Sequence, residues 1–240
     1  MSTEVLQQTL TQFQQVQKPA KKSTAYSMEL PEIKKQFLKK VEDLSYSRHH
    51  WQVWQDWTES AALAIANSVY HDDGIEKRYM AIVDRYNSEE MTQMAHLLGL
   101  TTAALEYKYQ DFLGAMFMEL ELGNKWRGQF FTPYNLCKVI AELTYSPEQY
   151  HDGVVTLDEP AVGAGAMVIA KCEMLEEKGV NYQQKLRVVA QDVDWMTFCM
   201  AYIQLSLIGC QAHVIHGNSL SMEANEAWCT PMAMIHGWFG

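Results

Sequence analysis

From Gly153 onward the chain alternates strand-like and helical segments, and this alternation limits the fold more than any other feature of the sequence. Residues 154–179 have the pattern of a strand, a glycine turn and a helix, and 185–194 form a second apolar strand-like run. A second helical segment follows at 196–209, and a third strand-like run at 212–220. Strands separated by helices in this way form parallel sheets with right-handed crossovers. The pattern therefore predicts an α/β fold with a parallel half-sheet that ends after the third strand.

The preceding residues have a different pattern, which is almost wholly helical from about Pro31 to Leu122. Before them, residues 1–17 have apolar side chains at helical spacing, and 18–24 resemble a linker. We expect three units: an amphipathic segment and linker at 1–24, a helical domain at 25–127, and a sheet-containing domain at 128–240. Within the helical domain three tryptophans recur every third residue, and we interpret this stripe as core packing (Trp51, Trp54 and Trp57).

The composition excludes several classes of protein. Hydrophobic residues make up 48% of the 240 residues and charged residues 20%, a balance that supports a packed core and excludes global disorder. No apolar run approaches the roughly 20 residues of a membrane helix, and the first residues lack a signal-peptide pattern. The five cysteines form no CxxC pair, and His49, His50, His213 and His216 have no partners at metal-ligand spacing. We expect a cytoplasmic protein with reduced thiols, no metal site and no membrane contact.

Charge is unevenly distributed along the chain, although the net charge is −10. Residues 1–40 have a local balance of +4, because seven lysines outnumber three acids, whereas the remaining residues have a balance of −14. The lysines at 18–40 are either a solubilising surface or a set of phosphate contacts. If the protein contacts DNA, we expect these lysines or another subunit to provide the contact.

Three strand ends carry the residue types of a nucleotide pocket. The first strand runs into Asp158-Glu159-Pro160-Ala161-Val162-Gly163-Ala164-Gly165, whose small residues allow close backbone approach and whose helix start favours an anion. The second strand ends in Gln191–Asp194, where an acid can accept hydrogen bonds from ribose hydroxyls, and the third ends in His216–Ser219. Together they predict an adenosine pocket, although a tight structural turn would explain the glycines alone. Met167 or Val168 stands where a dinucleotide fingerprint needs a third glycine, which disfavours a nicotinamide enzyme.

Two motifs give the chain a resemblance to a known family. Residues 128–133, Gly-Gln-Phe-Phe-Thr-Pro, are followed by a helical segment and then by the glycine turn at 158–165. This order and separation resemble the N6-adenine DNA methyltransferases, especially the modification subunit of type I restriction systems and related phage and plasmid proteins. The stretch from Asp111-Phe112-Leu113-Gly114 through Met118-Glu119-Leu120 to Gly123-Asn124 is also similar to the helix that leads into the first motif there. The resemblance covers roughly residues 105–220.

The resemblance implies a Rossmann-like domain that binds S-adenosylmethionine. Phe130, Phe131, Thr132 and Pro133 would lie over the methionine end of the cofactor, with Thr132 bonding its carboxylate and Glu159 facing its ammonium group. Ala161, Gly163 and Gly165 would allow close backbone approach, Asp192 would hold the ribose hydroxyls, and Val193 would pack on the adenine. Asn218 stands where the family usually has an aspartate that accepts from the adenine amino group. Gln129 of the first motif completes this implied cofactor-binding set.

One motif of the family is missing from the sequence. Its (N/D)PP(Y/F) motif holds the flipped target base, but this chain has no adjacent prolines. The nearest candidate, Cys229-Thr230-Pro231-Met232, lacks both the amide and the aromatic ring, so the catalytic residues stay unassigned.

Two functions follow from this departure. One is an S-adenosylmethionine-dependent DNA adenine-N6 methyltransferase that needs a partner or unconventional residues for transfer. The other is a degenerate binding or regulatory module, acting in anti-restriction or as a partner subunit. We also expect the open edge of the first strand to be covered by Trp228–Phe239, by the N-terminal helices, or by another subunit in a homo-oligomer or a mixed complex.

Overall fold

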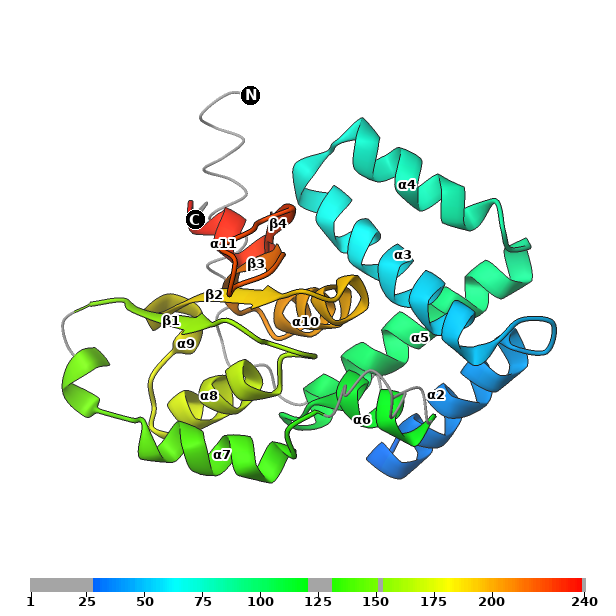
Figure 1. Ribbon diagram of the computed structural model, residues 1–240. Helices are drawn as coiled ribbons and strands as arrows, with labels where there is room; N and C mark the ends of the chain where they lie inside the picture. Colours follow the sequence, from blue (N-terminus) through cyan, green and yellow to red (C-terminus); the bar gives the residue numbers. More distant parts are fainter. Residues whose placement is uncertain (1–27, 121–130, 151–152, 239–240) are drawn as a thin grey trace, which may run out of the picture.

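The computed structural model describes residues 28–120, 131–150 and 153–238. Its first part is helical, as the sequence predicts, and contains α2 (Leu30–Leu44), α3 (His50–Tyr70), α4 (Asp73–Val83), α5 (Ser88–Tyr107) and α6 (Phe112–Glu119) (Figure 1). Side-chain caps begin several of these helices: Asp72 accepts from the amide of Ile75, and Asn87 forms a reciprocal capping box with Glu90. The amphipathic helix predicted at 1–17 lies outside the described residues.

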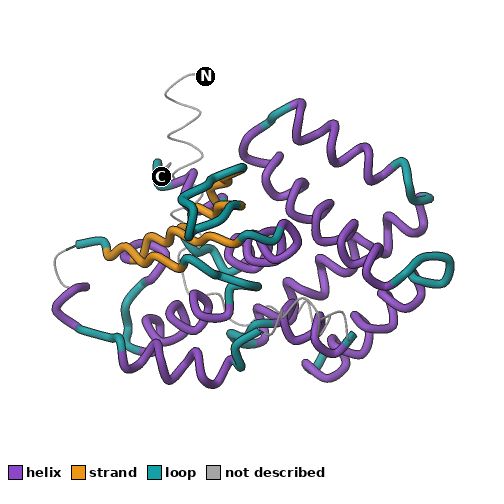
Figure 2. Tube along the Cα trace, in the orientation of Figure 1, coloured by secondary structure: helices purple, strands orange, loops and turns teal. Residues whose placement is uncertain are grey.

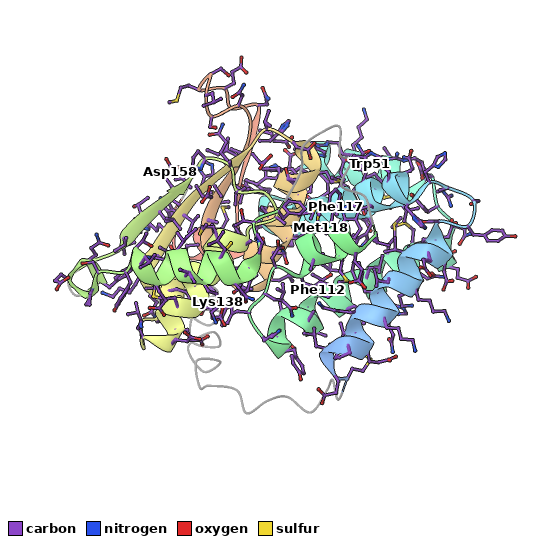
Figure 3. All side chains as sticks on the ribbon, turned by 60° about the horizontal axis from the view of Figure 1, so that its bottom comes forward. Trp51, Phe112, Phe117, Met118, Lys138 and Asp158 are labelled. Carbon is purple, nitrogen blue, oxygen red and sulfur yellow. The ribbon has the colours of Figure 1, made fainter. Side chains whose placement is uncertain are left out.

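The tryptophan stripe packs in the core of the helical part, which confirms its interpretation. Trp54 and Trp57 on α3 are almost completely buried, and both rings meet Phe37 of α2 edge-on. Trp51, one turn earlier, is partly buried and contacts Phe117 of α6 (Figure 3). This cluster of rings therefore fixes α2, α3 and α6 together.

The second part is the predicted parallel half-sheet. Strands β1 (Val155–Glu159), β2 (Leu186–Asp192) and β3 (Gln211–His216) lie side by side in that order and run parallel. The helices α8 (Ala166–Glu177) and α10 (Trp195–Leu207) connect them, and the smaller elements are α7 (Tyr134–Leu143), η1 (Pro147–Tyr150) and α9 (Tyr182–Lys185). Figure 2 shows the strands gathered in one half of the molecule and most of the helix in the other.

A fourth strand extends the sheet at its far edge. Glu226–Cys229 forms β4, which pairs antiparallel with β3, and α11 (Pro231–Ile235) follows it. Trp228–Phe239 is one of three expected covers for the open edge of the first strand, and this expectation is wrong, because the described residues 228–238 lie at the edge of β3. The reason is packing, because the Trp228 ring lies 5.0 Å from Phe198 and 5.2 Å from Tyr202, both on α10.

The opposite edge of the sheet remains open in the described part of the chain. There β1 pairs only with β2. A cavity of about 300 Å³ lies beside this edge, and its apolar wall includes Ile140, Tyr150 and Leu157. On α7 the neighbouring side chain of Leu143 is 80% exposed.

The buried hydrophobic residues form one continuous cluster from α2 to β4, which includes the described part of both the helical and the sheet-containing regions. The boundaries predicted at residues 24 and 127 stay predictions. All five cysteines are free and buried. In the described ranges, no helix has the length and hydropathy required to cross a membrane.

Candidate functional site

The glycine turn leaves β1 and enters α8 in a backbone conformation that its glycines permit. Gly163 and Gly165 have φ values of +56° and +102°, which side chains with a Cβ rarely adopt. The turn is tied to the neighbouring strand, since the amide of Val162 donates to the carbonyl of Gln191 at 2.9 Å. Asp158 lies at the carboxyl end of β1, just before this turn (Figure 3).

The two sequence motifs meet at this turn. A Cβ added to Gly163 would lie 3.2 Å from the ring of Phe131, so the aromatic residue of the first motif packs directly on the second. Between them is a cavity of about 110 Å³. It is lined by Phe131, Thr132, Cys137, Glu159, Ala161, Val162, Gly163, Ala164, Ala166 and Met167.

Glu159 gives the cavity a desolvated carboxylate. It is half-buried, and among the described residues it accepts one hydrogen bond, a long one from the amide of Ala161 at 3.4 Å. Burial raises the pKa of Glu159, and the negative charges of Asp158 and Asp192 raise it further. None of the ion pairs among the described residues involves Glu159. The site is therefore suited to a cationic group.

Asp192 joins the end of β2 to the same turn. Its Oδ2 accepts from the amide of Gly163 at 2.9 Å, and its Oδ1 accepts from the amide of Asp194 and the hydroxyl of Thr197. The next side chain, Val193, is 66% exposed and so presents an apolar surface beside the carboxylate. This arrangement places a carboxylate and an apolar side chain together at the carboxyl edge of the sheet.

The other residues that the sequence predicts for the site are not all part of this arrangement. Asn218 follows β3 at the same edge, but its Oδ1 accepts from the amide of Leu220 at 3.0 Å and is engaged in its own turn. Pro133 caps α7 and is exposed, next to the cavity-lining Thr132. Gln129 and Phe130 lie outside the described residues.

Sequence reasoning missed some residues of the cavity wall. Cys137 is fully buried on the first turn of α7 and donates weakly to the carbonyl of Thr132 at 3.9 Å. Its position one helical turn after Pro133 was an available signal, because residues at this spacing share the face of a helix. Met167, at the start of α8, also lines the cavity.

Residues 229–232, the nearest candidate for the missing motif, lie at the other end of the sheet from this cavity. Because β4 runs antiparallel to β3, Cys229 pairs with His213, and Thr230 follows toward the amino end of β3. The hydroxyl of Thr230 donates to the carbonyl of Cys210 at 2.6 Å and accepts from the amide of Ala212 at 3.0 Å. Glu159 and Asp192 lie at the carboxyl ends of their strands. Residues 229–232 therefore lie near the amino ends of the parallel strands, at the other end of the sheet from the cavity.

Two solved structures are similar to this chain. A class I S-adenosylmethionine-dependent methyltransferase from Listeria monocytogenes has 16% sequence identity and a TM-score of 0.44, with 79% of this chain and 54% of that one covered. The type I restriction-modification system methyltransferase subunit from Streptococcus thermophilus has 10% identity and a TM-score of 0.45, with 82% and 60% covered. The chain thus spans between 54% and 60% of the length of these proteins.

A search of curated proteins finds no match. The family model described as N-6 DNA Methylase matches residues 109–236, which is more than half of the 240 residues. That range contains both the cavity and the half-sheet. The chain therefore belongs to the N-6 DNA methylase family, whose cofactor is S-adenosylmethionine.

Proposed function

We propose that this chain binds S-adenosylmethionine in the cavity between Phe131 and the glycine turn, as the cofactor-binding part of a DNA adenine-N6 methyltransferase. The observation that supports this most is the convergence of two motifs separated in sequence. Phe131 and Thr132 line the same cavity as Glu159 and Gly163, at the carboxyl end of β1. Ligands of open α/β sheets bind at this edge.

The residues fit the methionine end of the cofactor. Glu159 is a half-buried carboxylate without a cationic partner among the described residues, and it would pair with the ammonium group. Thr132 would bond the carboxylate of the cofactor, and Phe131 would pack against its aliphatic chain. Ala161, Gly163 and Gly165 would let the backbone approach closely. Bound S-adenosylmethionine supplies an activated methyl group.

The adenosine end would extend along the carboxyl edge of the sheet. Asp192 would accept from the ribose hydroxyls in addition to its present bonds, in which Oδ2 accepts from Gly163 and Oδ1 from Asp194 and Thr197. The exposed Val193 would pack on the adenine. We assign Asn218 to the adenine amino group, and Gln129, Phe130 and Pro133 to the covering segment, on the resemblance alone.

We further propose that methyl transfer needs groups from another subunit or from residues outside the described part. Residues 229–232 lie near the amino end of β3, whereas Glu159 lies at the carboxyl end of β1. The open edge of β1 supports the presence of a second subunit, because exposed strand edges are normally paired or covered. DNA would contact the lysines of α2, of which Lys35 and Lys39 are exposed, or that subunit.

A second candidate function is a binding or regulatory module that retains the cofactor pocket without transferring the methyl group. The position of Thr230 favours it, since the segment nearest in sequence to the catalytic motif instead caps α11. Such a protein would act in anti-restriction or as the partner of a complete methyltransferase.

Methyl-labelled cofactor separates these functions. The protein would be incubated with labelled S-adenosylmethionine and unmethylated DNA, with and without extract of the source cells. Label at adenine N6 in the presence of extract supports the methyltransferase. Label that binds the protein but never reaches DNA supports the regulatory module, and no binding contradicts both.

If the lysines of residues 18–40 contact DNA, their replacement by alanine weakens DNA binding and its salt dependence.

A further inference from the structure

Gln204 is a fully buried polar residue in the otherwise apolar middle of α10. Its Nε2 donates to the carbonyl of Ala164 at 2.7 Å and to Oδ1 of Asp111 at 2.8 Å. Its Oε1 accepts from the amide of Leu113 at 3.1 Å. One amide side chain therefore joins the glycine turn to the start of α6 with all three of its hydrogen bonds inside the core.

Asp111 has the matching position at the start of α6. Its Oδ1 also accepts from the amide of Gly114 at 2.9 Å, so it caps the helix. A Cβ at Gly114 would collide with the Asp111 carboxylate, which explains the glycine in the Asp-Phe-Leu-Gly stretch. Burial raises the pKa of Asp111.

A second contact joins α6 to the same turn. The ring of Phe117 on α6 meets the ring of Phe131 edge-on at 5.4 Å, and Phe131 packs on Gly163. Figure 3 shows Phe112 and Phe117 on α6. Helix α6 is therefore linked to the turn twice, through Gln204 at its start and through Phe131 near its end.

We propose that Gln204 is a positioning residue for the cofactor turn, which it holds in register with α6 through Asp111. Its bond fixes the carbonyl of Ala164, which stands between Gly163 and Gly165, the two residues of this turn with positive φ. This inference rests on the proposed cofactor site. The Asp-Phe-Leu-Gly stretch then serves the site without contacting the ligand.

The test compares Gln204→Glu with Tyr202→Phe. The glutamate keeps an acceptor for Leu113 but directs a carboxylate at Asp111 and at the carbonyl of Ala164. The control lies on the same helix and removes one buried hydrogen bond, from Tyr202 to the carbonyl of Cys229 at 3.1 Å, away from the turn. Two quantities are measured: the Kd for S-adenosylmethionine and the exchange rates of the Gly163 and Gly165 amides without ligand.

We expect both quantities to rise at least about tenfold in Gln204→Glu and to stay within about twofold in Tyr202→Phe. Because exchange needs no ligand, faster exchange with a wild type that fails to bind would support the positioning role and contradict the proposed function. Unchanged exchange in a folded Gln204→Glu, or equal effects in both variants, would overturn the inference.

A measurement on the wild type covers the case in which Gln204→Glu does not fold. If one side chain ties the two segments, the Leu113 amide exchanges by the same opening as the Gly163 and Gly165 amides, and their rates change together as urea is added. Leu113 rates that vary independently of the turn would contradict the inference.

Discussion

At the scale of single residues, the ligand preference of the site depends most on Glu159. It is the cavity-lining carboxylate, and burial together with the charges of Asp158 and Asp192 raises its pKa. A raised pKa means that the folded protein disfavours the ionised form, because desolvation and like charge both oppose it. A bound ammonium group would reverse this preference, so ligand binding and the ionisation of Glu159 should be coupled.

We expect the affinity for S-adenosylmethionine to fall as the pH is lowered through the pKa of Glu159, since protonation removes the charge that pairs with the ammonium group. Glu159→Gln should bind at least about tenfold more weakly at neutral pH and lose most of this dependence. Calorimetric titrations between about pH 5 and pH 8 measure both effects. Tighter binding at low pH, or a Glu159→Gln variant that keeps the wild-type profile, would contradict this role.

The residues of the site differ in how far the sequence predicts them. Phe131, Thr132, Glu159 and Gly163 belong to local motifs, and the cavity brings these four together. Gln204 has no motif, and a single glutamine in an apolar helix does not reveal its partners. Its bonds cross 93 residues to Asp111 and 40 residues to Ala164, so only the folded chain identifies them.

At the scale of elements, the segment formed by β4 and α11 has a structural role at the edge of β3. Thr230 is fully buried where the strand ends, and its hydroxyl bonds the carbonyl of Cys210 and the amide of Ala212. It also caps α11 through the amide of Ala233. This segment thereby covers the edge of β3, and none of its residues lines the cavity beneath Phe131.

We expect Thr230→Ala to lower the free energy of unfolding by about 1–3 kcal/mol, because it leaves buried backbone groups without a partner. The Kd for S-adenosylmethionine should stay within about twofold, a difference of less than about 1 kcal/mol, because Thr230 does not line the cavity. Urea denaturation and calorimetry measure the two quantities. A large loss of affinity with unchanged stability would place residues 229–232 in the site after all.

The elements also show why the sequence predicts one edge of the sheet and not the other. The three parallel strands are apolar runs that alternate with helices, and this pattern is local. By contrast, β4 has only four residues and begins with Glu226, so its sequence lacks a strong strand signal. Its position depends on Trp228, which packs among rings of α10 that a local sequence pattern does not reveal.

At the scale of the whole molecule, Arg78 links the helical part to the last strand. Its guanidinium group on α4 bonds both carboxylate oxygens of Glu226 at 2.7 and 3.0 Å and lies 3.3 Å from Glu59 of α3. It also lies 4.7 Å from the centre of the Trp195 ring. Together with the continuous core, this contact makes the described parts one packed body.

We expect Arg78→Met to lower the free energy of unfolding by about 1 kcal/mol, with a smaller effect at high salt, because the side chain is 38% exposed and its charges are screened. Unfolding in urea should remain a single transition. The control Arg85→Met removes an ion pair to Asp56 within the helical part. Separate transitions for the helical and sheet-containing parts of the wild type would show that the core is not shared.

The central claim is that the cavity under Phe131 binds S-adenosylmethionine, and calorimetric titration of wild type, Gly163→Asp and Gly153→Asp tests it most directly. At position 163 a side chain would meet Phe131, require a strained φ and add negative charge beside Asp192, whereas Gly153 has open space around it. We predict that wild type and Gly153→Asp bind alike and that a folded Gly163→Asp does not bind. A wild type without affinity, or a Gly163→Asp variant that binds as the wild type does, would contradict the account.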